Sequence, residues 1–133
     1  ACTREDFNRV SLGLTAYKYD ALIEDSEAYG EYILNDIEEL WGKMLYNGAT
    51  SFWETIDGSE DFARAASLCH GWSSAPMYFL WKYMAGVYPQ EPGFKTIKPK
   101  ALNENIRLNG KIKTPQGIFE ITVNGGNTAV KAV

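Results

Sequence analysis

The chain is divided by a cluster of prolines and glycines that no long helix can cross. Pro89, Pro92, Gly93 and Pro99 fall within eleven consecutive residues. A proline removes a backbone donor and clashes with the preceding helical turn, so a helical pattern must end here. Before the cluster apolar residues recur every three or four positions, and after it they alternate. We therefore predict an α+β fold, divided into residues 1–90 and 91–133.

The part before the boundary has the sequence pattern of two long helices. The first has one apolar face, formed by Leu14, Tyr17, Ala21 and Leu22. The second has the longer series Tyr29, Ile33, Ile37, Leu40, Trp41 and Met44. Asp25 or Ser26 suits the start of this helix, and Asn47-Gly48 suits its end. We expect its acidic residues on the solvent side: Glu27, Glu31, Asp36, Glu38 and Glu39. Two such helices with a short connection form an antiparallel helical hairpin.

Two shorter helices are predicted between this hairpin and the boundary. Residues 62–68 form the first. The second begins at Ser73-Ser74-Ala75-Pro76, because proline is tolerated in a first helical turn. Its expected buried stripe consists of Met77, Leu80, Trp81, Met84 and Val87.

The part after the boundary has the pattern of a small antiparallel sheet. Apolar residues alternate over 106–112 and 118–123, and a last strand is expected over 128–133. Residues 115–117 and 124–127 form the turns between them, and residues 94–97 are a candidate fourth strand. A sheet of about forty residues buries too little surface to be stable alone. It must either pack on the helices or belong to a longer protein.

Charge and composition exclude several classes of protein. The net charge is −4 over 133 residues, which disfavours a nucleic-acid partner. Residues 1–66 carry a net charge of −9 and residues 67–133 carry +5. No apolar run approaches the length of a membrane span. The two cysteines, Cys2 and Cys69, are far apart, and we interpret both as free thiols.

Two short segments hold the residue types from which a reactive site could be built. The single histidine, His70, stands beside Trp72, and either a buried structural role or a contact with a substrate hydroxyl fits it. Glu54 follows Trp53, and either a salt-bridged carboxylate or one tuned by aromatic neighbours fits it. Asp57 is a second carboxylate in the same loop, where capping of a turn is the simpler interpretation. Indole rings beside carboxylates suit carbohydrate binding, because sugar C–H faces stack on them.

Three ordered motifs resemble the end of the catalytic domain of bacterial α-L-rhamnosidases. They are Gly48-Ala49-Thr50-Ser51-Phe52-Trp53-Glu54, then Ser67-Leu68-Cys69-His70-Gly71-Trp72-Ser73-Ser74-Ala75-Pro76, then Gly86-Val87-Tyr88-Pro89-Gln90-Glu91-Pro92-Gly93-Phe94-Lys95. The resemblance implies that residues 1–90 are the last helical hairpins of a six-hairpin (α/α)6 barrel. Residues 91–133 would then belong to the β-sandwich domain that follows it. Alanine at position 75 departs from the glycine expected before the proline.

The resemblance also implies an activity and roles for individual residues. Members of this family are inverting glycoside hydrolases, which use one carboxylic acid and one carboxylate. Glu54 matches the general base and His70 a histidine that contacts the sugar, and we add Trp53 and Trp72 as wall or platform residues. The general acid lies upstream in the family, outside this sequence. The chain would then be a C-terminal fragment, so whether it is an enzyme alone is left open. No cofactor or metal is implied.

Other functions fit the same sequence. One alternative is a non-catalytic carbohydrate-binding or structural module whose working part is the C-terminal sheet. Another is an interaction domain with an unrelated function. We expect a carbohydrate containing L-rhamnose as the partner, with no nucleic acid and no membrane. Barrel helices that lack their neighbours would expose apolar surface, which favours a homo-oligomer. The location, bacterial cytoplasm or secreted, is left open.

Overall fold

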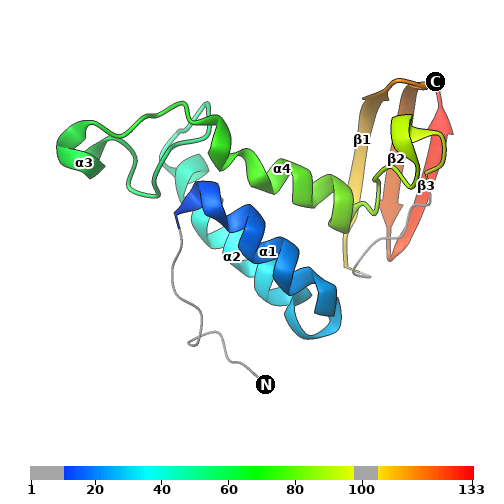
Figure 1. Cartoon of the computed structure of the whole chain (residues 1–133), viewed down its shortest axis with the longest axis horizontal. Coiled ribbons are helices and arrows are strands. Elements are labelled where there is room, and N and C mark those ends of the chain that lie inside the picture. The colour runs from blue at the N-terminus through cyan, green and yellow to red at the C-terminus, as the bar shows by residue number, and fades with distance from the viewer. Residues whose placement is uncertain (1–10, 98–104) are drawn as a thin grey trace. The chain divides into compact units, whose positions relative to one another are not determined.

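The computed structural model describes residues 11–97 and 105–133 of the chain (Figure 1). It combines helices with a three-stranded antiparallel sheet, which confirms the predicted α+β class. The chain forms two compact units, Ala1–Pro76 and Met77–Val133. They are called the N-terminal unit and the C-terminal unit below. The predicted division at residue 90 concerns the domains of a parent enzyme and stays a prediction.

Two consecutive helices form the body of the N-terminal unit. Helix α1 covers Thr15–Leu22 and helix α2 covers Ser26–Tyr46, with a tight 3₁₀ turn between them (Figure 1). Asp25 caps α2, because its carboxylate accepts a hydrogen bond from the Ala28 N–H at 3.1 Å. Helix α2 ends before Asn47, and Gly48 follows in the left-handed region at φ 76°. The predicted start and end of this helix are confirmed.

The buried face of α1 differs from the predicted one. Leu14 and Tyr17 are 50% and 75% exposed. The buried positions are instead Leu12, Thr15, Tyr19 and Ile23. These positions recur at intervals of three and four, so the helical period was right and the choice of face was wrong. Asp36, predicted on the solvent side of α2, is also buried.

The predicted helix over residues 62–68 is wrong. Helix α3 covers only Asp61–Arg64, and Phe62, Ala63 and Arg64 all have positive φ. A right-handed helix requires negative φ, so it cannot continue through these residues. The Ala65 and Ala66 N–H groups donate back to the Asp61 carbonyl, and only from Ser67 onward do the backbone hydrogen bonds reach a distant loop, residues 51–54.

The helix predicted from Ser73 onward begins as expected but changes its period. Helix α4 covers Ala75–Phe79 and continues as a π-helical segment over Leu80–Met84. The Ala85 N–H donates to the Leu80 carbonyl at 2.9 Å, five residues earlier. In the predicted stripe, Val87 is buried but Met77 is 48% exposed, and Phe79 is buried in its place. Met77 and Phe79 both lie in α4, before the π-helical segment begins, so this mismatch is an error in the predicted face of the helix and not an effect of the π turn.

The C-terminal unit contains the sheet. Its strands are β1 (Arg107–Thr114), β2 (Gly117–Asn124) and β3 (Asn127–Ala132), in the order β1-β2-β3. All three agree with the predicted strands to within two residues at each end. The candidate strand at 94–97 is reduced to an isolated bridge between Pro89 and Ile97.

One face of the sheet forms the core of the C-terminal unit. The buried cluster consists of Ala85, Val87, Ile106, Ile121 and Val123. The alternation of β2 places Ile121 and Val123 on the same face, next to Leu108 and Val130 on the neighbouring strands. Within the described residues, the helices are all too short or too polar to cross a membrane.

Candidate functional site

Two loop segments that carry the predicted site residues are bound to each other. They are residues 51–54 and 67–70, called the paired loops below. The Glu54 N–H donates to the Ser67 carbonyl at 2.8 Å, and the His70 N–H donates to the Phe52 carbonyl at 2.7 Å. The Ser51 hydroxyl also donates to the Leu68 carbonyl at 2.5 Å. The fold therefore brings the aromatic-acid segment and the histidine segment side by side.

The Glu54 carboxylate is held in place by the opposite loop. Its Oε2 accepts a hydrogen bond from the Ser67 N–H at 2.9 Å, and the residue is half-buried. Among the residues that the structure describes, none donates a hydrogen bond to Oε1. Ser67 is itself fixed, because its hydroxyl accepts from the Cys69 N–H and donates to the Cys69 carbonyl. Glu54 is therefore an oriented carboxylate with one oxygen available to a water or a ligand.

His70 and Trp72 form a second part of the candidate site. Their ring centroids are 6.0 Å apart at an interplanar angle of 75°. Trp72 is 78% exposed and lies in a 3₁₀ turn whose Ser73 carbonyl accepts from the indole N–H of Trp41 at 2.8 Å. The Cβ atom of Trp72 lies close to Gly13, since a Cβ added to Gly13 would be only 3.2 Å from it. The turn is anchored while the indole itself is open to a partner.

Trp53 differs from Trp72 in what its ring contacts. The ring of Trp53 lies against Gly58, where an added Cβ would come within 2.8 Å of ring atom Cε3. Gly58 also has φ 62°, so both space and backbone conformation require glycine there. Trp53 thus packs on its own loop, and its proposed role as a wall of the site stays a prediction.

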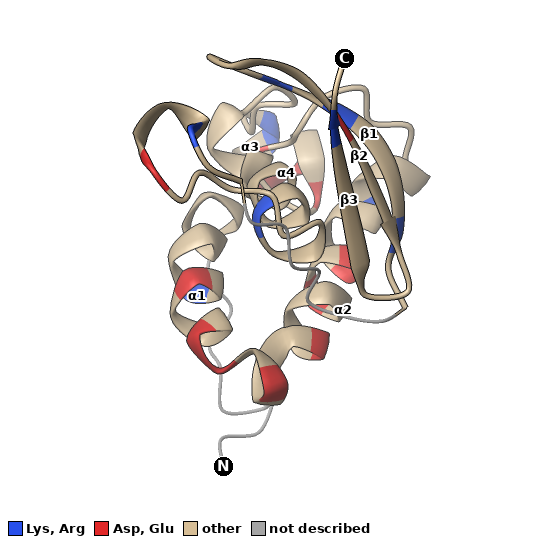
Figure 2. Ribbon diagram, turned by 90° about the vertical axis from the view of Figure 1, so that its right-hand side faces the viewer, with Lys and Arg blue, Asp and Glu red and all other residues tan. Residues whose placement is uncertain are grey.

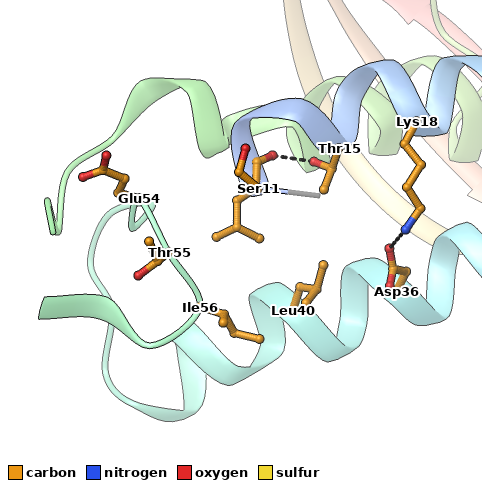
Figure 3. A pocket seen from close by; sticks show the side chains of 9 residues that line it. Ser11, Thr15, Lys18, Asp36, Leu40, Glu54, Thr55 and Ile56 are labelled. Atoms are coloured by element: carbon orange, nitrogen blue, oxygen red, sulfur yellow. Dashed lines mark hydrogen bonds and ion pairs between the residues drawn. The ribbon is translucent and has the colours of Figure 1, made fainter. Parts of the chain in front are cut away.

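Glu54 also lines a pocket between the paired loops and the helices. The pocket has a volume of about 160 Å³ and lies entirely in the N-terminal unit. Figure 3 shows Glu54 at one end and the Lys18–Asp36 ion pair at the other. Leu40 and Ile56 line the space between them. The pocket therefore joins a carboxylate, a charged pair and an apolar surface.

The far end of this pocket is a buried polar cluster. Asp36 Oδ2 accepts hydrogen bonds from Lys18 Nζ at 2.9 Å and from the Tyr19 hydroxyl at 2.7 Å. Burial and then the hydrogen bond to Asp36 raise the pKa of Tyr19 well above its ordinary value. Burial lowers the pKa of Lys18, but its bonds to Tyr32 and Asp36 outweigh this and raise the pKa overall. Tyr19 and Lys18 therefore keep their protons and act as donors to Asp36.

The sequence contained a signal for Asp36 that the solvent-side prediction ignored. Asp36 lies three residues after Ile33 and four before Leu40, which places it on the apolar face of α2. A carboxylate at such a position needs a donor, and Lys18 and Tyr19 provide it.

The second loop carboxylate and the cysteines have simpler roles. Asp57 was predicted to cap a turn, and this prediction is wrong: its side chain forms no hydrogen bond to the 3₁₀ turn that follows. The Asp57 carboxylate instead pairs with Lys43 Nζ at 2.5 Å on the surface. Cys69 is a free, exposed thiol, and Cys2 lies outside the described residues. In residues 11–97 and 105–133, no group of three or more His, Cys, Asp or Glu side chains could hold a metal ion.

Comparison with known proteins does not assign the chain to a family. No protein-family model matches it, and no curated protein matches it significantly. The resemblance to α-L-rhamnosidases therefore depends on the three ordered motifs alone.

Proposed function

We propose that the chain supplies the general base and a sugar contact to an inverting glycoside hydrolase that acts on terminal α-L-rhamnosides. The observation that carries this proposal is the hydrogen bonding of the paired loops, which joins the Glu54 motif to the His70 motif. Two motifs that the resemblance assigns to one sugar site are thus adjacent in space. The consecutive helices α1 and α2 would be one hairpin of the proposed (α/α)6 barrel.

The geometry of Glu54 suits the role of a base. Ser67 binds Oε2, so Oε1 can accept a proton from a water molecule. As the water oxygen bonds to the anomeric carbon, its proton passes to Glu54. The bond to the leaving oxygen breaks, and a second carboxylic acid protonates that oxygen from the opposite face. Asp36 is a poor candidate for this acid, because Lys18 and Tyr19 already donate to it. The proposal places the acid upstream in the parent enzyme.

His70 and Trp72 would bind the sugar in this scheme. The imidazole can donate to or accept from a ring hydroxyl. The exposed indole of Trp72 can stack on the C–H face of the same ring, because the π face is negative and the C–H hydrogens are positive. Both groups come from one short segment, so their spacing is fixed by the turn at Gly71–Ser74.

The first test is a titration of the 133-residue chain with L-rhamnose, followed by tryptophan fluorescence. We expect saturable quenching at millimolar sugar that is lost in His70→Ala. Cys69→Ala is the matched control, because Cys69 is the exposed neighbour of His70. The absence of saturable quenching, or an equal loss in the control, would refute the sugar contact.

The second test concerns proton transfer in the full-length parent enzyme that carries this chain. Glu54→Gln should retain sugar binding and lower kcat by about 10²–10⁴-fold, the usual contribution of general acid–base catalysis. Asp57→Asn is the control, since Asp57 lies in the same loop but pairs with Lys43. Retained turnover in Glu54→Gln would disprove the assignment of the base. If the chain is instead a non-catalytic carbohydrate module, Glu54→Gln should leave both sugar binding and the turnover of the parent enzyme unchanged.

A further inference from the structure

The sheet of the C-terminal unit is bounded by two strands whose open edges differ. Within the part of the chain that the structure describes, the strand order is β1-β2-β3, so β1 and β3 each pair with β2 alone (Figure 1). An unpaired edge exposes backbone N–H and C=O groups that can bind another strand. Neither edge belongs to the proposed hydrolase site, because Glu54 and His70 lie in the N-terminal unit.

The hydrogen-bond register identifies the backbone groups that face the open edge of β3. The Val133 N–H donates to the Ile118 carbonyl at 2.9 Å, and the pairs that bond to β2 recur at every second residue from there. The residues between them direct their N–H and C=O groups away from β2: Thr128, Val130 and Ala132. Among the described residues, no backbone group bonds to these outward-facing groups. Strand β3 therefore offers three donors and three acceptors to a further strand.

The edge of β1 is protected against pairing with a copy of itself. Alternate residues of β2 bond to β3, so the residues between them bond to β1. The residues of β1 whose backbone groups face outward are then Arg107, Asn109, Lys111 and Lys113. In antiparallel pairing of two copies of β1, every register that joins three or more of these residues places cations opposite one another. Like charges in that position destabilise a pair of strands, and lysines on open edges are a common defence against association.

The edge of β3 lacks this protection. Its outward-facing residues are uncharged, and the half-burial of Thr128 and Val130 places their side chains on the core face of the sheet. In one antiparallel register, Val130 stands opposite Val130 of a second copy, and Thr128 stands opposite its Ala132. Lys131, the one cation of β3, then faces Ala129 of that copy. This register therefore opposes no like charges.

The same register extends the apolar core of the C-terminal unit. Gly110, Ile121 and Val130 form one row across the three strands. Trp81 lies over Gly110, where an added Cβ would be 2.7 Å from ring atom Cη2. At the other end of the row, Val130 packs against the core cluster but is only half-buried. A second Val130 beside it would cover the apolar surface that is open at the edge.

We propose that β3 is a pairing edge, at which two copies of the chain form an antiparallel dimer with two-fold symmetry and one continuous sheet. The central Val130 pair and the two Thr128–Ala132 pairs each exchange two backbone hydrogen bonds. Such an interface uses the same surface on both copies, and this edge is complementary to itself. Because the contact is small, we expect a weak dimer with a Kd on the order of 10⁻⁴ M. The dimer is independent of the proposed hydrolase function.

The test introduces opposite charges at one exposed position. Ala129 of each copy faces Lys131 of the other, so a substitution there acts twice in the dimer. Ala129→Glu should strengthen the dimer about fivefold, and Ala129→Lys should weaken it about fivefold. Sedimentation equilibrium of the 133-residue chain, from about 10 µM to about 1 mM, measures each Kd. The net charge of the chain is −4, so general repulsion between copies predicts the reverse order of the two variants.

Thr122→Glu and Thr122→Lys are the matched controls. Thr122 lies opposite Ala129 on the neighbouring strand β2 and is exposed. It is one strand away from the edge, so it does not face the second copy. The two substitutions make the same changes in charge and should leave the Kd nearly unchanged.

Amide hydrogen exchange identifies the edge that pairs. Protection of the Val130 N–H should rise with chain concentration, whereas protection of the outward-facing Lys111 N–H on β1 should not. Three results would each overturn the proposal: a chain that stays monomeric, equal effects at Ala129 and Thr122, or association without added protection of Val130. Loss of association in Tyr17→Ser would also overturn it, because Tyr17 is an exposed residue of helix α1 and the interface would then lie on the helices.

Discussion

The two units of this chain are stabilised in different ways. The N-terminal unit buries apolar residues but also takes Thr15, Asp36 and Ser73 into its interior. The core cluster of the C-terminal unit is entirely apolar, and hydrogen-bonded strands cover it. The charge differs as well: Figure 2 shows acidic residues on α1 and α2 and basic residues along the strands.

This difference determines where chemistry can be located. The paired loops of the N-terminal unit have little regular structure, so individual side-chain and backbone bonds hold them. Such loops can present a carboxylate, a histidine and an indole from separate segments. The regular sheet instead provides an edge at which another strand can pair. The contrast predicts distinct responses to substitution in the two units.

The largest expected effect is in the apolar core of the C-terminal unit. Ile121 is 1% exposed, so Ile121→Ala should lower the free energy of unfolding by about 2–5 kcal/mol through lost burial and a cavity. Ile118 on the same strand is 44% exposed, and Ile118→Ala should cost about 1 kcal/mol or less. Urea unfolding followed by the Trp81 indole signal measures both. The Trp41 indole signal reports on the N-terminal unit in the same experiment. If Ile121→Ala lowered the stability measured at Trp41 as much as that measured at Trp81, the division into two units would be contradicted.

The polar interior of the N-terminal unit predicts sensitivity to alkaline pH. Burial and Asp36 raise the pKa of Tyr19, so above pH 10 the unfolded state loses the phenolic proton while the folded state keeps it. The folded state then binds more protons, and stability falls by about 1.4 kcal/mol per pH unit for this group. The raised pKa of Lys18 acts in the same direction at higher pH.

Tyr19→Phe provides the measurement for this effect. The variant loses a hydrogen bond to Asp36 at every pH, but its stability should fall less steeply between pH 10 and 11.5. Tyr17→Phe is the control, because Tyr17 is 75% exposed. Parallel stability curves for wild type and Tyr19→Phe would show that Tyr19 does not cause the loss.

Sequence patterns predicted the regular parts of the molecule better than the irregular ones. The three strands and the limits of α2 were predicted closely, because alternation, capping and turn residues are local signals. The same approach failed for residues 62–68. Residues 62–64 have positive φ, and Ser67 and Leu68 are bonded to residues 51–54, which are more than ten positions away and leave no periodic trace.

For the candidate site, the motifs predict roles for Glu54, His70 and Trp72 that stay predictions, and they did not indicate what surrounds these residues. The bond from Ser67 to Glu54 and the pocket with Lys18 and Asp36 depend on tertiary contacts. The packing of Trp53 on Gly58 is of the same kind, since a side chain's orientation in a loop follows from what it contacts. The burial of Asp36 was predictable from its helical position.

The smallest expected effect separates helix from loop within the N-terminal unit. Gly42 lies inside α2 and Gly48 directly follows its C-cap, and neither has a heavy atom within 4 Å of an added Cβ. Packing therefore contributes nothing to the difference between them. Gly42→Ala should stabilise by up to about 1 kcal/mol, because alanine favours helix. Gly48→Ala should destabilise by about 1 kcal/mol, because φ is 76° there.

Thermal unfolding of the two glycine variants should give midpoints on opposite sides of wild type. The double variant should return close to the wild-type value if the two backbone effects are independent. Destabilisation by both substitutions would mean that Gly42 serves a contact beyond the helix itself. Stabilisation by both would mean that the segment after α2 does not need its left-handed residue. Gly48 directly precedes the segment that carries Glu54. The Gly48→Ala variant should therefore also weaken the fluorescence quenching by L-rhamnose.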